Sequence, residues 1–171
     1  NGIRTDGLIF VDKRVHIIQS HHKSEDSRDV IIGTTKRGNG QAYRDKYARA
    51  GIRFGERHRF LNKNLVTALE GFDIDLYEEF HNNDNDVQVL CEGAQGFGLD
   101  IDWGDYPFVT SSHCTSASAL LNCIPWNAVR DVYGVAKTYE TYVGAKQFQP
   151  KNDVVFESLQ QFGSEFGATT G

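Results

Sequence analysis

The sequence lacks methionine altogether and contains only three cysteines, Cys91, Cys114 and Cys123. Three cysteines cannot all pair with one another, and none stands in a C-x-x-C motif, so we expect reduced thiols and a cytoplasmic location. No apolar run approaches the length of a membrane-spanning helix, and no secretory signal pattern opens the chain, which argues against membrane and secreted proteins. The missing methionine, together with an end in a Gly/Thr-rich stretch, favours an internal segment of a longer protein.

An excess of positive charge is also missing, since the net charge is −5 at pH 7. This balance argues against a general nucleic-acid-binding surface. With 39% hydrophobic and 24% charged residues, the composition is that of a soluble globular protein. The sequence shows no repeat, no low-complexity tract and no linker. We therefore treat residues 1–171 as a single unit, long enough for a hydrophobic core.

Apolar stretches that end in Gly-rich turns alternate with stretches of helical character. The pattern predicts strands at residues 7–18, 30–33, 87–91 and 132–143. It predicts helices at residues 41–50, 60–80, 115–121 and 154–162, the second interrupted near Gly71. This alternation favours an α/β fold with a mostly parallel sheet flanked by helices. Because ligands bind at the carboxyl ends of parallel strands, we expect four loops to converge, those after Ile32, Cys91, Val143 and Phe166.

Local signals add detail to this outline. Gly51 is expected to end the helix at residues 41–50, and Ser112 or Thr115 to cap the helix at residues 115–121. Residues 82–86, Asn-Asn-Asp-Asn-Asp, predict a turn. The alternating apolar residues of the first predicted strand are the expected core residues, namely Leu8, Phe10, Val15 and Ile17.

Residues 33–40, Gly-Thr-Thr-Lys-Arg-Gly-Asn-Gly, form the first candidate binding loop. Its glycines allow close backbone approach to a ligand. Thr34 and Thr35 add hydroxyls at the start of the following helix, where an anion is favoured. The loop is not a G-x-x-x-x-G-K-[ST] Walker A sequence, so it favours a monophosphate over a triphosphate.

The helix behind this loop carries a cluster of positive charge. Lys46, Arg49 and Arg53 are spaced three and four residues apart, so we expect them to share one face. Such a helix is, taken alone, more often a solvated surface with acidic neighbours. The Gly/Thr loop in front of it favours a phosphate site.

A second candidate loop follows the strand predicted at residues 87–91. The amide of Gln95 can donate and accept hydrogen bonds at once, which suits the edge of a purine, whereas a turn glutamine commonly points to water. Further along, Thr110, Ser111 and Ser112 offer three hydroxyls at a predicted helix N-terminus. Simple N-capping accounts for one such hydroxyl more easily than for three.

Three aspartates in one stretch, Asp100, Asp102 and Asp105, invite comparison with a calcium-binding loop. That interpretation fails because the acid required at the twelfth position is Ser111. We expect these carboxylates to be structural or to pair with nearby cations.

The histidines and cysteines give no ligand set with zinc spacing, so we predict no metal site on this chain. His16, His22 and His113 are expected to satisfy local hydrogen bonds. Cys91 is expected to be a buried strand residue rather than a nucleophile.

Two long motifs carry a family resemblance. GTTKRGNGQAYRDKYARAGIR at residues 33–53 resembles the GTT-x-RGIGPAY-x-DK-x-AR-x-GIR segment of adenylosuccinate synthetases. EGAQGFGLDIDWGDYPFVTSS at residues 92–112 resembles their EGAQ-x-x-LDID-x-GTYPFVTSS segment. DVYGVAKTYETYVGA and EFGATTG match two further blocks of that family in the right order. The match runs from about Leu8 to the last residue.

The resemblance implies a purine-biosynthesis ligase with a P-loop-NTPase-like fold, of which this chain is the middle portion. The family uses GTP to phosphorylate the purine O6 of IMP, and L-aspartate then displaces that phosphate to give adenylosuccinate. GTP and Mg²⁺ are therefore the expected cofactors. The expected partners are IMP, L-aspartate and a second copy of the chain, with no nucleic acid and no membrane.

Residue roles carried over by position follow from the same resemblance. Gln95 would contact the purine near O6, where charge develops, and Arg49 would reach a phosphate bound by the partner subunit of a homodimer. The other residues expected at the substrates are Thr35 and Thr110 at the 5′-phosphate with Thr34 beside them in the binding loop, Val143 and Gly144 at the ribose, and Ala168, Thr169 and Thr170 at the aspartate.

Some family parts have no match in this chain. The Gly-rich loop with the catalytic Asp and the Mg²⁺ site is missing, as are the His general acid and the guanine-reading Lys and Asp. We therefore expect the ligands of GTP and Mg²⁺ to lie outside residues 1–171 and the segment alone to be inactive.

Departures from the family pattern keep alternatives open. Gln41 stands where the family usually has Pro, Tyr142 replaces a usual Arg, residues 146–149 depart from G-P-F-P, and residues 57–86 are fewer than in typical members. Some phage relatives join aspartate to dGMP instead of IMP. The motif EGAQGFGL slightly favours the dGMP alternative, whereas the motifs GTTKRGNG and IDWGDYPFVTSS favour the ordinary enzyme that acts on IMP. A third alternative is a nucleotide-binding module without catalysis.

Overall fold

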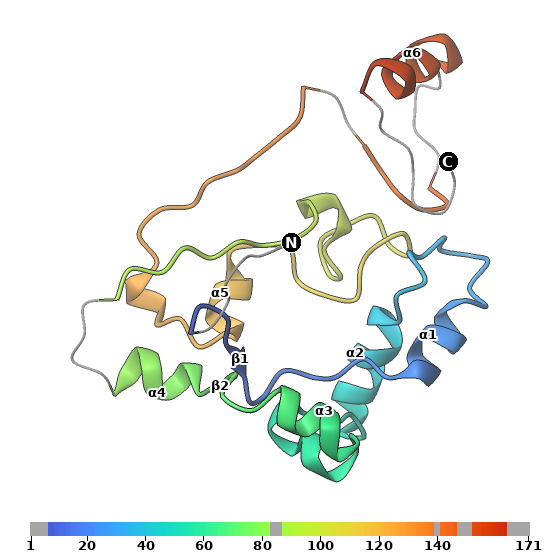
Figure 1. Ribbon diagram of the computed structural model, residues 1–171. Helices are drawn as coiled ribbons and strands as arrows, with labels where there is room; N and C mark the ends of the chain where they lie inside the picture. The colour runs from blue at the N-terminus through green and yellow to red at the C-terminus, as the bar shows by residue number, and fades with distance from the viewer. Residues whose placement is uncertain (1–6, 83–86, 139–140, 147–151, 164–171) are drawn as a thin grey trace.

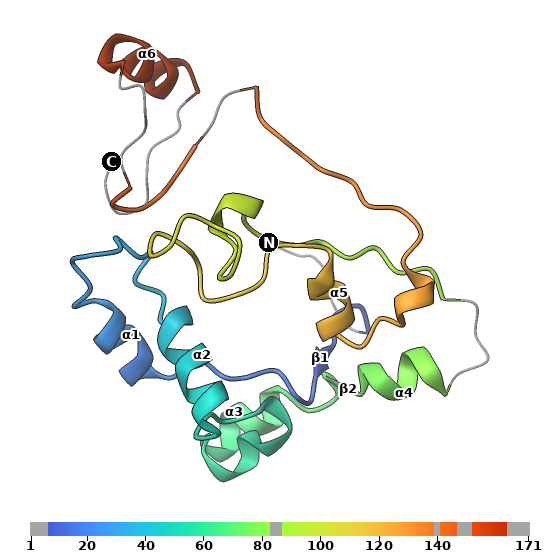
Figure 2. The same ribbon diagram turned by 180° about the vertical axis from the view of Figure 1, so that it is seen from behind.

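A computed structural model describes residues 7–82, 87–138, 141–146 and 152–163 (Figure 1). In chain order its helices and strands are β1 (Val11–Asp12), α1 (Ser20–Asp26), α2 (Asn39–Ala48), the 3₁₀ helix η1 (Phe54–Arg59), α3 (Lys63–Ala68), β2 (Asp73–Ile74), α4 (Leu76–His81), η2 (Phe97–Leu99), α5 (Ala117–Leu121), η3 (Trp126–Ala128) and α6 (Asp153–Gly163). Helices α1 and α2 lie side by side at one end and α4 at the other, with the sheet between them (Figures 1 and 2). Helix α6 lies apart from the other helices in both views.

The fold is α/β with a parallel sheet, as the sequence predicts. Strand β1 pairs with β2 in parallel, and the register sets Val11 against Asp73 and Asp12 against Ile74. Only residues 11–12 of the predicted strand at 7–18 are therefore strand, although His16 forms an isolated antiparallel bridge with Arg53. Within the described residues, no helix is long and apolar enough to cross a membrane.

The strands predicted at residues 30–33 and 87–91, and at the described part of 132–143, are wrong. A strand exists only where its amides bond to a neighbouring strand. The amides of Ile31, Ile32 and Gly33 bond instead to the side chain of Asp29. Along residues 87–91, no backbone hydrogen bond joins another part of the described chain. Cys91, expected to be buried in a strand, is consequently exposed.

The predicted helices are largely confirmed, with different ends. Helix α2 ends at Ala48, and Arg49 rather than Gly51 terminates it with a left-handed φ of 62°. The helix predicted at residues 60–80 is two helices, α3 and α4, separated at Gly71 and by β2. The expected caps Ser112 and Thr115 are wrong, because α5 begins at Ala117 after Ser116, whose side chain makes no capping bond. Helix α6 confirms the prediction at residues 154–162. The turn predicted at residues 82–86 lies, except for its first residue, outside the described residues.

The packed centre lies around α1, α2 and η1 rather than along residues 7–18. The buried apolar residues are Ala42, Ile52 and Phe54, whereas the predicted core residues Leu8, Phe10 and Val15 are 75%, 51% and 49% exposed, and Ile17 is half-buried. The reason is that residues 7–18 form only two strand positions, so their alternation meets no opposing layer. The buried polar residues His22, Asp26 and Arg57 belong to the same centre.

Candidate functional site

Two aspartates at the end of α1 shape the loop that follows. Asp26, at 3% exposure, accepts hydrogen bonds from the Thr34 hydroxyl at 2.9 Å and from the Gly38 amide at 2.7 Å. Asp29 accepts four backbone N–H bonds of 2.8–3.3 Å, from Ile31, Ile32, Gly33 and Thr34. Burial alone would raise the pKa of Asp29, but these four donors together outweigh it and lower the pKa.

Two glycines permit the loop to pack this closely. Gly38 has a φ of 83°, and a Cβ there would lie 2.9 Å from backbone and side-chain atoms of His22. Gly33 has a φ of 71°, and a Cβ there would lie 2.8 Å from the amide nitrogen of Ala145. Both positions therefore require glycine for conformation and for space.

Two of the four loops predicted to converge, those after Ile32 and Val143, come together, and the loop that carries Thr110 joins them. The Ala145 amide donates to the carbonyl of Ile32 at 2.9 Å, which joins residues 143–145 to the Gly/Thr loop. The Tyr142 hydroxyl donates to the carbonyl of Phe108 at 3.3 Å, and Lys146 forms an ion pair with Asp105, so residues 142–146 also hold the loop that carries Thr110.

The threonines predicted to bind phosphate differ in their exposure and in whether their hydroxyl groups are already hydrogen-bonded. The Thr34 hydroxyl already donates to Asp26. Thr35 is exposed, and Thr110 is half-buried with its amide donating to the carbonyl of Leu99 at 2.8 Å. Val143 is 39% exposed beside Gly144. Thr110–Ser112 do not stand at a helix N-terminus, because α5 begins only at Ala117.

Gln95, which was predicted to lie at the purine, is not brought into this group. Gln95 is exposed and has a φ of 64°, and no hydrogen bond joins it to the other site residues within the described chain. Ala168, Thr169 and Thr170, with the loop after Phe166, lie outside the described residues.

Lys46, Arg49 and Arg53 line one pocket of about 570 Å³ together with Lys13, Arg14 and His16. The prediction that the three share one face of a helix is wrong, because Arg49 and Arg53 lie beyond the end of α2. The three side chains nevertheless line the same pocket. Lys13 and Arg14 pair with Asp75. In the described parts of the chain, no acidic residue pairs with Lys46, Arg49 or Arg53. Glu56 also lines the pocket and offsets part of this charge, so the pocket offers an excess of cations to an anion.

His16 in this pocket departs from the prediction that it satisfies local hydrogen bonds. Its Nδ1 is buried without a hydrogen-bond partner among the described residues. Gly51 packs against this ring, because a Cβ at residue 51 would lie 2.5 Å from His16 Nδ1. Burial, followed by the charges of Lys46 and Arg53, lowers the pKa of His16. The lowered pKa favours the neutral imidazole, so the positive charge of the pocket comes from its lysines and arginines.

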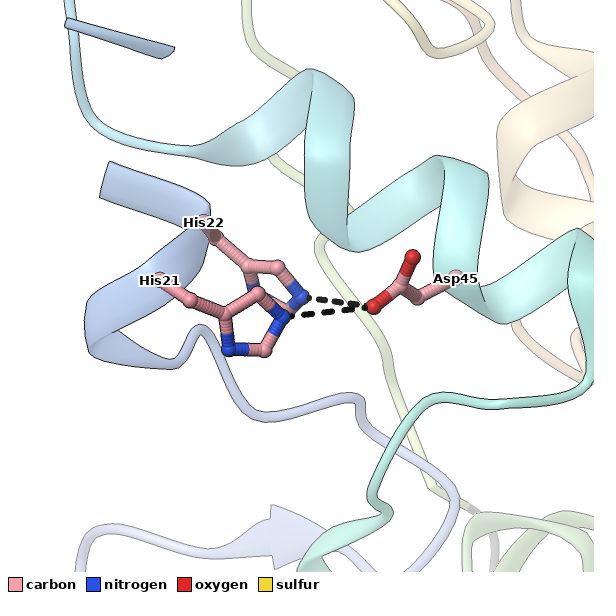
Figure 3. A group of neighbouring side chains, drawn as sticks. All are labelled: His21, His22 and Asp45. Carbon is pink, nitrogen blue, oxygen red and sulfur yellow. Dashed lines mark hydrogen bonds and ion pairs between the residues drawn. The ribbon is translucent and has the colours of Figure 1, made fainter. Parts of the chain in front are cut away.

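His21, His22 and Asp45 form a close group between α1 and α2. Both histidine Nε2 atoms lie near one carboxylate oxygen of Asp45, at 3.5 and 3.0 Å (Figure 3). These separations resemble those of zinc ligands, which lie about 3.3 Å apart when each is about 2.0 Å from a tetrahedral ion.

The hydrogen bonds nevertheless identify this group as a structural one. His22 Nδ1 accepts the Gln19 amide at 3.0 Å, so the ring proton is on Nε2 and points at Asp45. A metal ion at Nε2 would move that proton onto Nδ1, directly against the Gln19 N–H. The prediction that His22 satisfies local hydrogen bonds is confirmed. Hydrogen bonds from His22 and then Arg44 lower the pKa of Asp45 to about 2.

Asp100 and Asp105 have the roles that the sequence predicts, whereas the Asp102 side chain is 66% exposed. Asp100 is fully buried and accepts the amides of Asp102, Trp103 and Cys114 at 3.0, 3.2 and 2.6 Å. The Cys114 amide first, and then the other two, lower the pKa of Asp100 against its burial. His113 Nδ1 lies 3.8 Å from this carboxylate. Asp105 pairs with a cation, Lys146, as expected.

Sequence reasoning missed Asp26, Asp29 and Asp45 as organisers of the site. The available signal was the position of two acids just before a Gly/Thr loop, since short acidic side chains readily accept bonds from nearby amides. No local signal marks Asp45, because the histidines that it binds, His21 and His22, lie on another helix.

Comparison with known proteins gives one consistent result. The family model for adenylosuccinate synthetase matches residues 1–72 and 62–171. Adenylosuccinate synthetase of Helicobacter pylori (strain Shi470) is 36% identical over 205 residues, covering 96% of this chain and 50% of that protein. The enzyme of Carboxydothermus hydrogenoformans is 37% identical over 215 residues, covering 99% and 50%. The chain thus spans about half the length of the curated relatives it matches.

Solved structures agree with this result. Adenylosuccinate synthetase of Plasmodium falciparum, solved fully ligated, superposes with a TM-score of 0.82 at 30% identity, covering 94% of this chain and 48% of that one. Succinoaminodeoxyadenylate synthetase of cyanophage S-2L, solved with dGMP and dATP, gives a TM-score of 0.58 at 24% identity over 70% of this chain. The second likeness concerns the fold alone.

Proposed function

The chain belongs to the adenylosuccinate synthetase family, and from this premise we propose that it forms the acceptor-nucleotide part of an enzyme that joins L-aspartate to IMP, using GTP, to give adenylosuccinate. The observation that carries the proposal is the meeting of three loops. The Gly/Thr loop touches residues 143–145 through Ala145 and Ile32, and Tyr142 ties the loop of Thr110 to the same place. Such a meeting gives a nucleoside monophosphate contacts from several directions.

In this proposal each loop meets one part of the nucleotide. The hydroxyls of Thr35 and Thr110 donate to the 5′-phosphate, while Thr34, whose hydroxyl serves Asp26, contributes through the shape of the loop. Val143 and Gly144 lie at the ribose. Gln95 donates its amide to the purine O6, and Ala168, Thr169 and Thr170 begin the loop that binds the aspartate carboxylates.

The proposed chemistry is a transfer followed by a displacement. The terminal phosphoryl group of GTP moves to the purine O6 of IMP, and the amine of aspartate then attacks C6 and expels that oxygen as inorganic phosphate. A donor at O6 stabilises the negative charge that develops there, which is the role proposed for Gln95.

Mg²⁺ does not fit the described residues. Mg²⁺ prefers octahedral oxygen ligands. Both groups of possible metal ligands in the described chain include histidine, and Asp100 in one of them is already bonded to three amides. We therefore assign no step to Mg²⁺ or to a triphosphate site on this chain.

We further propose a cytoplasmic homodimer, in which Arg49 contributes to the partner subunit's phosphate site. The cations Lys46, Arg49 and Arg53 support this arrangement, since they outnumber the one acid, Glu56, in a pocket suited to an anion. The free thiols Cys91, Cys114 and Cys123 are compatible with a reducing compartment.

Substrate turnover tests the proposal directly. The full protein is incubated with GTP, aspartate and either IMP or dGMP, and release of inorganic phosphate is measured. We expect release with IMP. Release with dGMP alone would identify the phage-type reaction instead, and nucleotide binding without release would leave a binding module.

Thr110→Val tests the phosphate site. It should weaken IMP binding by the worth of one charged hydrogen bond, about 1.5–3 kcal/mol, or roughly 10- to 150-fold in Kd by calorimetry. Thr67→Val, an exposed substitution on α3, is the matched control. If both variants bind IMP equally well, Thr110 is not at the phosphate.

A further inference from the structure

One carboxylate receives the amides of four consecutive residues. Asp29 Oδ1 accepts Ile31 and Ile32 at 3.3 and 3.2 Å, and Oδ2 accepts Gly33 and Thr34 at 2.8 and 3.2 Å. Successive backbone N–H groups that point to one place make a concave anion site of the kind that binds phosphate. Here the anion inside it belongs to the chain itself.

The Asp29 carboxylate orders two segments of the proposed nucleotide site, the Gly/Thr loop and residues 143–145. Its four amides start the loop that continues into Thr35. The same turn presents the Ile32 carbonyl to the Ala145 amide at 2.9 Å, which places residues 143–145. Asp26 holds the far side of the loop through Thr34 and Gly38. The loop is therefore fixed from within, by carboxylates three residues apart, without any ligand.

We propose that Asp29 is a positioning residue: its carboxylate fills the anion-binding turn of residues 31–34 and so pre-forms the loop that receives the nucleotide phosphate. The proposal deepens the proposed function and rests on it for the identity of the ligand. A consequence is that the phosphate meets the threonine hydroxyls and not the amides of residues 31–34. Removal of the carboxylate should leave an empty anion-binding turn, which a small external anion can refill.

Chemical rescue with formate tests the vacated turn. In the full protein, Asp29→Gly removes the side chain and leaves space for formate, while Asp131→Gly removes an exposed aspartate as the matched control. The readout is the amide proton shifts of residues 31–34 by NMR. We expect these protons downfield in the unaltered protein, upfield in Asp29→Gly, and returned downfield by saturable addition of formate but not by chloride at equal ionic strength.

Nucleotide affinity tests the positioning role. If the empty turn leaves the loop correctly shaped about one tenth of the time, the apparent Kd for IMP rises about tenfold, and formate should reverse most of that loss. Turnover at saturating IMP should change little, because bound nucleotide selects the formed loop. Asp131→Gly should alter neither quantity.

Several results would overturn the proposal. Unchanged amide shifts in Asp29→Gly would show that the four bonds are absent, and a folded variant that formate does not alter would show that the turn binds no anion. If Asp29→Gly does not fold, Asp29→Asn replaces it, and it must shift the same amides upfield. Because the NMR readout needs no substrate, a protein that fails to bind IMP would refute the proposed function while leaving Asp29 separately tested.

Discussion

Aspartate side chains do much of the local ordering around the candidate site. Asp26, Asp29 and Asp45 each accept two or more hydrogen bonds from loops or helices. Bonds of this kind stabilise the ionised carboxylate relative to the acid. Asp29 and Asp45, whose pKa values are lowered, therefore link the shape of the site to their own ionisation.

Asp45 permits a test of this link by acid. Its pKa is lowered from 3.8 to about 2 in the folded chain. Stability from this group is thus fully present above the unfolded pKa of 3.8 and is lost as pH falls through that window towards about 2. We expect Asp45→Asn to lower the free energy of unfolding at neutral pH and to reduce its further loss on acidification, measured by urea unfolding at several pH values.

Asp131→Asn is the control for this acid test, because Asp131 is exposed and forms no hydrogen bond or ion pair with the described residues. It should leave the acid dependence as it was. Lys13 and then Arg14 lower the pKa of Asp75, so Asp75 also makes the free energy of unfolding depend on pH. Asp45→Asn should therefore reduce the slope of unfolding free energy against pH without removing it. An unchanged slope in Asp45→Asn would contradict the role of the His22–Asp45 bond.

Among the described residues, Arg57 connects several elements through polar contacts. The side chain extends from η1, and its guanidinium bonds both carboxylate oxygens of Asp73 in β2 at 2.5 and 2.7 Å. It also donates to the carbonyls of Phe54 and Leu69, and it lies 4.3 Å from the Phe54 ring centroid. One buried side chain thus joins η1, the end of α3 and the sheet.

Removal of Arg57 should therefore destabilise the protein well beyond a surface substitution. We expect Arg57→Ala to lower the free energy of unfolding by about 2–4 kcal/mol, since the carbonyls and carboxylate lose a largely buried charged partner. Arg59→Ala, which breaks an exposed 3.4 Å pair with Glu56, should cost less than about 1 kcal/mol. Urea unfolding of both variants measures the difference, and equal losses would refute the connecting role.

At the scale of the whole molecule, the cationic pocket leads to a prediction about assembly. A symmetric dimer contains each interface contact twice, so an Arg49 side chain that crosses the interface contributes to the other subunit's site. In a mixture of Arg49→Leu and Gln95→Leu subunits, one site of each heterodimer then has both residues intact. We expect activity to return on mixing, measured as phosphate release from IMP, GTP and aspartate.

The control for the mixing test carries both substitutions in one subunit, paired with an unaltered subunit. If Arg49 acts across the interface, this heterodimer has no intact site; if it acts within its own subunit, one site remains. Native mass spectrometry establishes that heterodimers are present. Failure of Arg49→Leu and Gln95→Leu subunits to recover activity together would end the shared-site proposal.

The sequence by itself determined the family, the α/β class and most helices of this protein. Residues 33–53 and 92–112 carry motifs long enough to identify the family without a structure. Helices α2 and α6 follow from local preference and periodicity, because each helical hydrogen bond joins residues four apart. The Gly/Thr loop was recognisable for the same reason, since its glycines and hydroxyls act locally.

Only the tertiary structure decided which apolar runs become strands and which charges meet. Residues 30–33 read as a strand, but their amides bond to Asp29, and residues 87–91 have no described neighbour to pair with. Arg49 and Arg53 share a pocket with Lys46 although the helix ends before them. Strand pairing and charge clustering depend on residues distant in sequence, whereas helices and turns depend on near neighbours, and that difference separates what was predictable from what was not.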